Sequence, residues 1–166
     1  MRILAIAAVV AASLLASRPG VASAPRLPVV PCGDVIGHHA SGTADGYRTV
    51  LGVVSVPPVY LSQVVPSGQA PMRWWRKAGM IVRSGSPPVT LTVPYALHNE
   101  LQIDWGNSHR QGSALRFAAC PSYGHPTWNA YAGGFLLRHR PACVSLIVTV
   151  GQRRATVRFG LGTRCH

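Results

Sequence analysis

The sequence contains few acidic residues, and this shortage argues against hydrolysis by paired carboxylates. Its only carboxylate side chains are those of Asp34, Asp45, Glu100 and Asp104. Glu100 and Asp104 are expected on one face of a strand, where four residues at roughly 3.3 Å each place them about 13 Å apart. Glycoside hydrolases hold their two carboxyl groups about 5–9.5 Å apart. The spacing therefore excludes this pair as a catalytic dyad.

Other common catalytic and metal-binding motifs are also missing. The sequence contains no G-x-S-x-G, H-E-x-x-H or C-x-x-C, and its single lysine, Lys77, is not preceded by S-x-x-K. We therefore predict no catalytic residues, no bound metal and no cofactor, and we interpret the chain as a non-enzymatic protein. An extracellular enzyme whose site follows none of these motifs remains the alternative.

A long apolar run occurs only at the N-terminus. Arg2 is followed by Ile, Leu, Ala and Val from 3 to 16, interrupted only by Ser13. This run of about 14 residues is shorter than the roughly 20 needed to span a bilayer, and small residues follow it at 20–24. The pattern predicts a signal peptide over residues 1–24, cleaved after Ala22 or Ala24. We expect a secreted protein without a transmembrane segment, either extracellular or associated with the cell wall.

All four cysteines lie beyond the predicted signal peptide. An even number of cysteines in an exported chain predicts two disulfides rather than a metal site. Four cysteines allow three pairings, and the sequence does not choose among them. We favour Cys32–Cys165, which would tie the two ends of the chain together, with Cys120–Cys143 as the second bond.

Hydrophobic residues beyond the signal alternate with a period of two, which is typical of strands and not of helices. The clearest alternation covers 89–93, 101–105, 115–119, 144–150 and 155–161, and further strands are expected at 47–56, 59–65, 72–82 and 128–137. We predict an all-β fold, a small antiparallel β-sandwich of about 7–9 short strands that is immunoglobulin-like in general architecture. A loop at 25–46 would lead into this single domain at 47–166.

Two glycine positions add detail to this prediction. Gly151-Gln152 between two alternating segments indicates a tight hairpin. Gly133-Gly134 within 128–137 indicates a bulge or a close approach of another backbone.

Several segments resemble a set of uncharacterised small exported proteins of actinobacterial type. The similar segments are Val82-Arg83 with Gly85, Pro88–Pro94, Trp128–Phe135, Ala142–Val144, and Val157–Gly160 ahead of Cys165. The resemblance covers roughly the last half of the chain. It implies secretion, a β-sandwich and the cysteine framework, but it implies no activity and identifies no functional residue.

The positive charge is the strongest compositional signal. Without Arg2 and Arg18 the chain keeps 14 of its 16 basic residues against 4 acidic ones, a formal charge of +10. Such a charge favours binding to anionic polymers outside the cell. Alternation over 72–83 places Arg73, Trp75 and Lys77 on one strand face, where a tryptophan could stack a sugar ring and the cations could meet its phosphate or carboxylate. Alternatively, the tryptophans belong to the core and the arginines serve solubility.

Three functions follow from these patterns. The first is a binding domain for an anionic cell-wall polymer or an extracellular protein, monomeric and without specific nucleic-acid recognition. The second is a secreted protease inhibitor that presents a disulfide-held loop at 120–124. The third is the motif-free extracellular enzyme mentioned above.

The signal peptide generates the first prediction. Protein secreted by a suitable host should begin at Ser23 or Pro25, as determined by N-terminal sequencing. Recovery of intact Met1 in the membrane fraction would contradict it.

Overall fold

The computed structural model describes residues 27–43, 46–107, 110–122, 127–140 and 142–165. The predicted signal peptide lies outside these ranges. Within them the chain forms strands and two 3₁₀ turns, Cys32–Asp34 and Tyr95–Leu97. The described residues include no helix long and apolar enough to cross a membrane. The predicted all-β fold class is confirmed.

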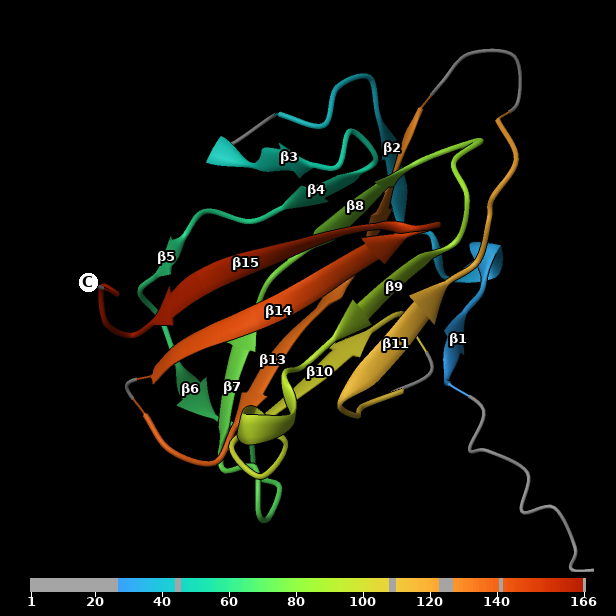
Figure 1. The fold of residues 1–166 in the computed structure, drawn as a ribbon. Helices are drawn as coiled ribbons and strands as arrows, with labels where there is room; N and C mark the ends of the chain where they lie inside the picture. The colour runs from blue at the N-terminus through green and yellow to red at the C-terminus, as the bar shows by residue number, and fades with distance from the viewer. Residues whose placement is uncertain (1–26, 44–45, 108–109, 123–126, 141, 166) are drawn as a thin grey trace, which may run out of the picture.

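The largest sheet has six strands and crosses the front of the molecule in Figure 1. Its order is β1 (Val29–Val30), β11 (Ala114–Phe117), β9 (Val89–Thr92), β14 (Ala142–Val150), β15 (Arg153–Leu161) and β5 (Tyr60–Leu61). β14 and β15 form the predicted hairpin, with nine paired residues each and Gly151 at a φ of 57° in its two-residue turn. Such a turn needs positive φ, which glycine adopts without steric cost.

Two smaller sheets complete the described part of the fold. The four-stranded sheet has the order β10 (Leu101–Trp105), β13 (Gly133–Leu137), β7 (Trp74–Lys77) and β6 (Val65–Pro66). The five-stranded sheet has the order β2 (Gly37–His39), β12 (Trp128–Tyr131), β8 (Met80–Arg83), β4 (Val54–Val56) and β3 (Arg48–Val50).

The described ranges contain fifteen strands, more than the expected 7–9. Four segments expected as single strands each divide into two, namely 47–56, 59–65, 72–82 and 128–137. In three of them the two halves enter different sheets. The expected loop at 25–46 is also wrong in part, because it contains β1 and β2.

The division between β7 and β8 is held by specific hydrogen bonds. The indole nitrogen of Trp105 donates to the carbonyl oxygen of Ala78 at 2.8 Å, and the Ala78 amide donates to the carbonyl of Gly133 at 2.8 Å. These bonds satisfy backbone groups that a strand break would otherwise leave buried without partners.

Aromatic side chains join the three sheets in one core. Phe135 of β13 lies 5.1 Å from Phe159 of β15, and Phe117 of β11 lies 4.9 Å from Tyr131 of β12, measured between ring centroids. All four rings are buried. The six-stranded sheet therefore packs against both smaller sheets, because its rings contact rings from each of them.

The two predicted disulfides are present, but the favoured pairing is wrong. The bonds are Cys32–Cys120 and Cys143–Cys165. β1 pairs in parallel with β11, so that Cys32 and Cys120, just beyond these strands, have Cα atoms 5.5 Å apart. β1 and β15 stand four strand spacings apart in the sheet, about 19 Å, which exceeds the ~7 Å limit for a disulfide. Cys32 and Cys165 therefore cannot meet.

The Cys32–Cys120 bond adjoins a buried phenol. The hydroxyl of Tyr131 lies 3.4 Å from Cys120 Sγ, and the side chain is only 1% exposed. Asp34, buried nearby, accepts a hydrogen bond of 2.9 Å from Arg110. Burial, and secondarily the negative charge of Asp34, raises the pKa of Tyr131 from 10.0 to about 12. The folded protein therefore holds this proton more tightly than the unfolded chain.

This pKa predicts a loss of stability in alkali. Because the folded pKa exceeds the unfolded one, the stability contribution is complete below pH 10 and disappears as the pH rises toward 12. Its size is on the order of 2–3 kcal/mol. Absorbance at 295 nm should show a late-titrating component that is missing in Tyr131→Phe, and urea unfolding of that variant should depend less on pH between 10 and 12. An unchanged titration curve in Tyr131→Phe would contradict the assignment.

Candidate binding groove

The outer face of the four-stranded sheet carries the best candidate site. Successive side chains of β7 point to opposite faces, so Trp75 and Lys77 share one face and Trp74 lies on the other. Trp74 packs against the core, while Trp75 is half-buried and Lys77 is exposed. Trp75 stands opposite Val65 of β6 and Leu136 of β13. The strand pairs on both sides therefore hold its backbone in place.

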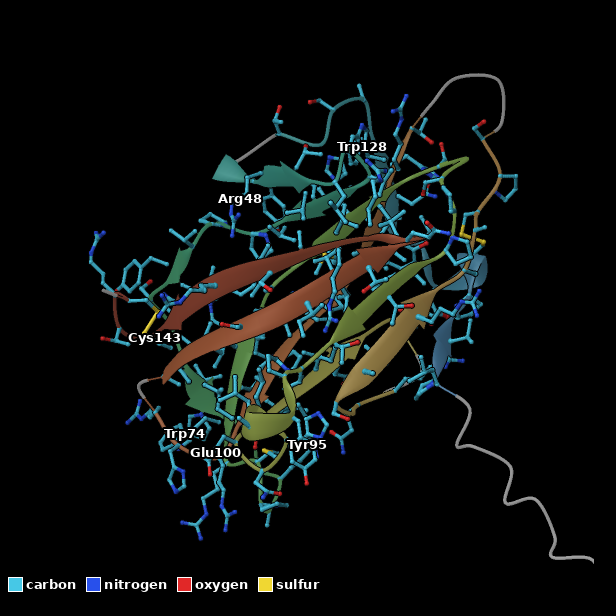
Figure 2. All side chains as sticks on the ribbon, viewed as in Figure 1. Arg48, Trp74, Tyr95, Glu100, Trp128 and Cys143 are labelled. Carbon is cyan, nitrogen blue, oxygen red and sulfur yellow. A yellow bond between two sulfur atoms is a disulfide. The ribbon has the colours of Figure 1, made fainter. Side chains whose placement is uncertain are left out.

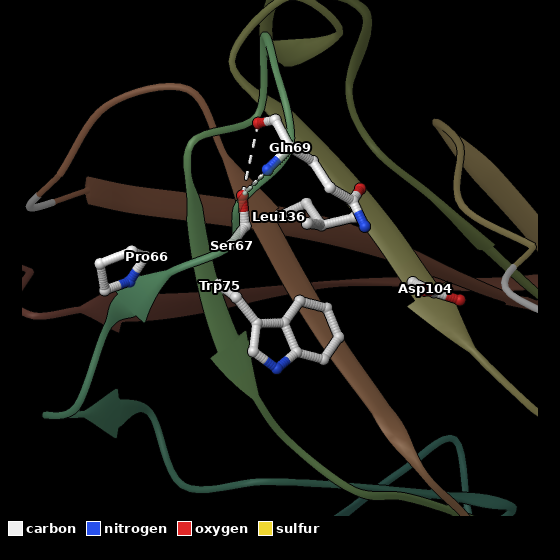
Figure 3. A pocket seen from close by; sticks show the side chains of 6 residues that line it. All are labelled: Pro66, Ser67, Gln69, Trp75, Asp104 and Leu136. Atoms are coloured by element: carbon white, nitrogen blue, oxygen red, sulfur yellow. Dashed lines mark hydrogen bonds between the residues drawn. The ribbon is translucent and has the colours of Figure 1, made fainter.

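Two adjoining hollows share Trp75 and Asp104, and we call them together the Trp75 groove. One has a volume of about 300 Å³ and the other about 370 Å³. The lining residues are Pro66, Ser67, Gln69, Trp75, Asp104 and Leu136 in the first, and Trp75, Lys77, Asp104, Gly106, Asn107, Ala132 and Gly133 in the second. Figure 3 shows the first hollow, with the indole of Trp75 below Ser67 and Gln69 and with Asp104 to one side.

The loop from Ser67 to Met72 forms one end of the groove. The Ser67 hydroxyl donates to the backbone carbonyl of Met72. It accepts a hydrogen bond of 3.0 Å from the backbone amide of Gln69. The Ser67 amide donates to the carbonyl of Arg73 at 2.9 Å. These contacts close the loop on itself beside Trp75.

A row of three residues crosses the sheet next to Trp75. Lys77 of β7 stands opposite Gly134 of β13, which stands opposite Asp104 of β10. Gly134 adds no side chain between them, and two strand spacings place the Cα atoms of Lys77 and Asp104 roughly 10 Å apart. Among the described residues that line the groove, one lysine and one aspartate are charged, and their formal charges cancel.

Arg73 does not join Trp75 and Lys77. It lines a separate cavity of about 410 Å³, the Trp74 pocket, with Ala70, Pro71, Trp74, Arg138 and His139. The loop divides the two sites, since Ser67 and Gln69 line the groove whereas Ala70 and Pro71 line the pocket. Of the three residues predicted to form one face, the structure brings together Trp75 and Lys77.

Cations gather around the Trp74 pocket. The guanidinium carbon of Arg140 lies 3.8 Å from the centroid of the Trp74 ring. Nδ1 of His139 lies 2.7 Å from Oε2 of Glu100. Both pairs belong to the lower end of the molecule in Figure 2, where Trp74 and Glu100 are labelled. The pocket itself is lined by two arginines, with the third stacked on its tryptophan.

Sequence reasoning missed Asp104, Gln69 and Asn107 as members of the groove. Alternation in 101–105 marks Asp104 as outward-facing, but the pairing of β13 with β10 on one side and with β7 on the other has no signal in the local sequence. For the inhibitor hypothesis, the loop 120–124 is described only as far as Ser122, and its remaining residues lie outside the described ranges. In the described part of the chain no three His, Cys, Asp or Glu side chains gather as metal ligands.

The glycine in the row across the sheet generates a prediction. A Cβ at Gly134 would lie 2.0 Å from the carbonyl oxygen of Arg76, so alanine would force β13 and β7 apart. We expect Gly134→Ala to lower the free energy of unfolding by about 1–3 kcal/mol, measured by urea denaturation. Gly37→Ala is the matched control, because a Cβ in that strand meets nothing within 4 Å. Equal stability of the two variants would contradict the close contact.

Together the two sites offer an aromatic surface, hydrogen-bonding side chains and a cluster of cations. The groove supplies the indole of Trp75 with two amides, a carboxylate and an ammonium group around it, a combination suited to the flat face and hydroxyls of a sugar. The pocket supplies guanidinium groups, which suit phosphate or carboxylate. Protein-family models, curated proteins and solved structures give no match to this chain.

Proposed function

We propose that this chain is an exported, non-enzymatic binding domain for an anionic glycopolymer of the cell envelope, with a sugar ring stacked on Trp75. Its two disulfides support the proposed export, because such bonds persist in oxidising compartments. As part of this proposal, the three sheets build a β-sandwich of immunoglobulin-like general architecture, and the domain acts as a monomer.

The half-buried indole of Trp75 on the outer face of the sheet is the observation that carries the proposal. A strand hydrogen-bonded on both sides holds this tryptophan, so that stacking requires little further ordering of the protein. Its neighbour Trp74 packs against the core instead. The proposal uses the tryptophan on the outer face of the sheet and leaves the other to the fold.

The polar groups around Trp75 support a sugar as the stacked unit. Gln69 and Asn107 each provide an amide, which both donates and accepts hydrogen bonds. Asp104 accepts hydrogen bonds and Lys77 donates them. A sugar ring needs this mixture, because each of its hydroxyls is both donor and acceptor.

The net charge supports an anionic polymer as the complete ligand. A formal charge near +10 on the exported chain attracts polyanions through interactions that salt screens over about 8–10 Å. Stacking on Trp75 is less sensitive to salt. The two contributions can therefore be separated by measuring binding at two ionic strengths.

Substitution of Trp75 tests the proposal. Trp75→Ala should weaken binding to wall teichoic acid and to an acidic polysaccharide about tenfold at both low and physiological salt, as measured by titration calorimetry, because the stacking contribution is lost. Tenfold corresponds to about 1.4 kcal/mol. The control is Tyr95→Ala, which removes an 89% exposed aromatic side chain that does not line the groove.

Two results would count against the proposal. One is equal, feeble binding of wild type and Trp75→Ala to both polyanions, which would leave only non-specific charge attraction. The other is an equal loss of affinity in Tyr95→Ala and Trp75→Ala, which would mean that any exposed ring contributes as much.

A further inference from the structure

The tryptophan proposed to stack a sugar and the cluster of arginines belong to different cavities of this protein. The described residues that line the Trp75 groove include one cation, Lys77, and one anion, Asp104. The Trp74 pocket contains Arg73 and Arg138, and Arg140 stacks on its tryptophan. An anionic group in the groove would lie near the Asp104 carboxylate, whereas one in the pocket would lie among guanidinium groups.

The three arginines reach the pocket from two segments. Arg73 directly precedes β7, while Arg138 and Arg140 follow β13, the strand paired with β7. Leu137, the last residue of β13, stands opposite Trp74, the first residue of β7. The strand pairing therefore brings the cationic ends of both segments to the same edge. Guanidinium groups present forked donors that match the oxygens of phosphate and carboxylate.

Stacking on Trp74 also restrains one of these cations. The guanidinium of Arg140 lies over the ring at 3.8 Å, and its Nη1 donates to the carbonyl of Val64 at 3.5 Å. An arginine already held in this way loses less side-chain freedom when an anion binds. The carboxylate of Glu100 lies 2.7 Å from Nδ1 of His139, which lines the pocket. This carboxylate thus has a cationic or hydrogen-bonding partner beside the pocket.

From this arrangement we propose that the Trp74 pocket is a subsite for an anionic group, phosphate or carboxylate, of the same glycan whose uncharged ring stacks on Trp75. This inference rests on the proposed function and specifies its ligand. The ligand class is a glycan in which charged and uncharged units are neighbours, in contrast to a polymer with an anion on every stacked unit.

The spacing of the two sites supports neighbouring units on one chain. Arg73 and Trp75 are two residues apart, so their Cα atoms lie at most about 7 Å from each other. The loop 67–72 contributes to both cavities, with Ser67 and Gln69 lining the groove and Ala70 and Pro71 lining the pocket. We therefore expect neighbouring units of one oligosaccharide to reach both sites.

A matched pair of oligosaccharides tests the subsite. A hyaluronan octasaccharide alternates uronic acids with uncharged amino sugars, and its carboxyl-reduced form has the same rings without the charges. The double variant Arg73→Gln/Arg138→Gln should bind the charged form at least tenfold more weakly and with a flatter salt dependence, because anion contacts are lost. Its affinity for the reduced form should stay within twofold of wild type.

Two further comparisons test the position of the lost charge and the kind of anion. Arg153→Gln/Arg154→Gln removes the same charge from the exposed start of β15 and should change the affinity for the charged octasaccharide less than threefold. A glucosylated poly(glycerol phosphate) carries phosphate in place of carboxylate. The anion whose binding falls further in the pocket variant is the one the pocket prefers.

The outcomes separate this inference from the proposed function. Suppose that Trp75→Ala lowers the affinity for both octasaccharides. If the pocket variant then lowers the affinity for the charged and the reduced form equally, or lowers the affinity for the charged form no more than the Arg153/Arg154 control does, the groove binds sugar and the anion subsite is wrong. If wild type binds neither octasaccharide nor the phosphate polymer, or if Trp75→Ala changes nothing, the proposed function itself fails.

Discussion

The close backbone contact at Gly133 and Gly134 is the constraint on which the layout of this protein depends. A Cβ at Gly133 would lie 2.1 Å from the carbonyl oxygen of Asp104, and one at Gly134 would lie 2.0 Å from that of Arg76. Only glycines allow β13 to lie this close to β10 on one side and to β7 on the other. The same contact sets the row of Lys77, Gly134 and Asp104 on the outer face. The geometry of the groove is therefore a consequence of how the sheet packs.

The alternation of β7 then gives two adjacent tryptophans opposite environments. Trp74 stands opposite Leu137 and packs against the core, and Trp75 stands opposite Leu136 on the outer face. Because the pleat reverses direction at each residue, a ring for stacking and a ring that supports an arginine come from neighbouring positions. The loop 67–72 separates the cavities beside them. This loop thus separates the groove, with its lysine and aspartate, from the cationic pocket.

Local patterns in the sequence predicted the features that depend on neighbouring residues. The alternation over 89–93 and 101–105 corresponds to β9 and β10, and Gly151-Gln152 forms the expected hairpin turn. The close approach expected at Gly133-Gly134 is also confirmed. In each case the cause lies within a few residues, in the pleat of a strand or in the steric freedom of glycine.

Features that depend on distant pairing were not predictable in this way. Cys32 meets Cys120 because β1 adds in parallel to β11, and no local pattern indicates that pairing. For the same reason Arg73 was grouped with Trp75 and Lys77. Strict alternation places all three on one face, but Arg73 precedes the first residue of β7, where the chain leaves the pleat and enters the loop. Sequence alternation holds only while a strand is paired, and the ends of pairing are set by partners elsewhere in the chain. The Trp74 pocket lies at such an end, and its cations therefore become neighbours only in the folded protein.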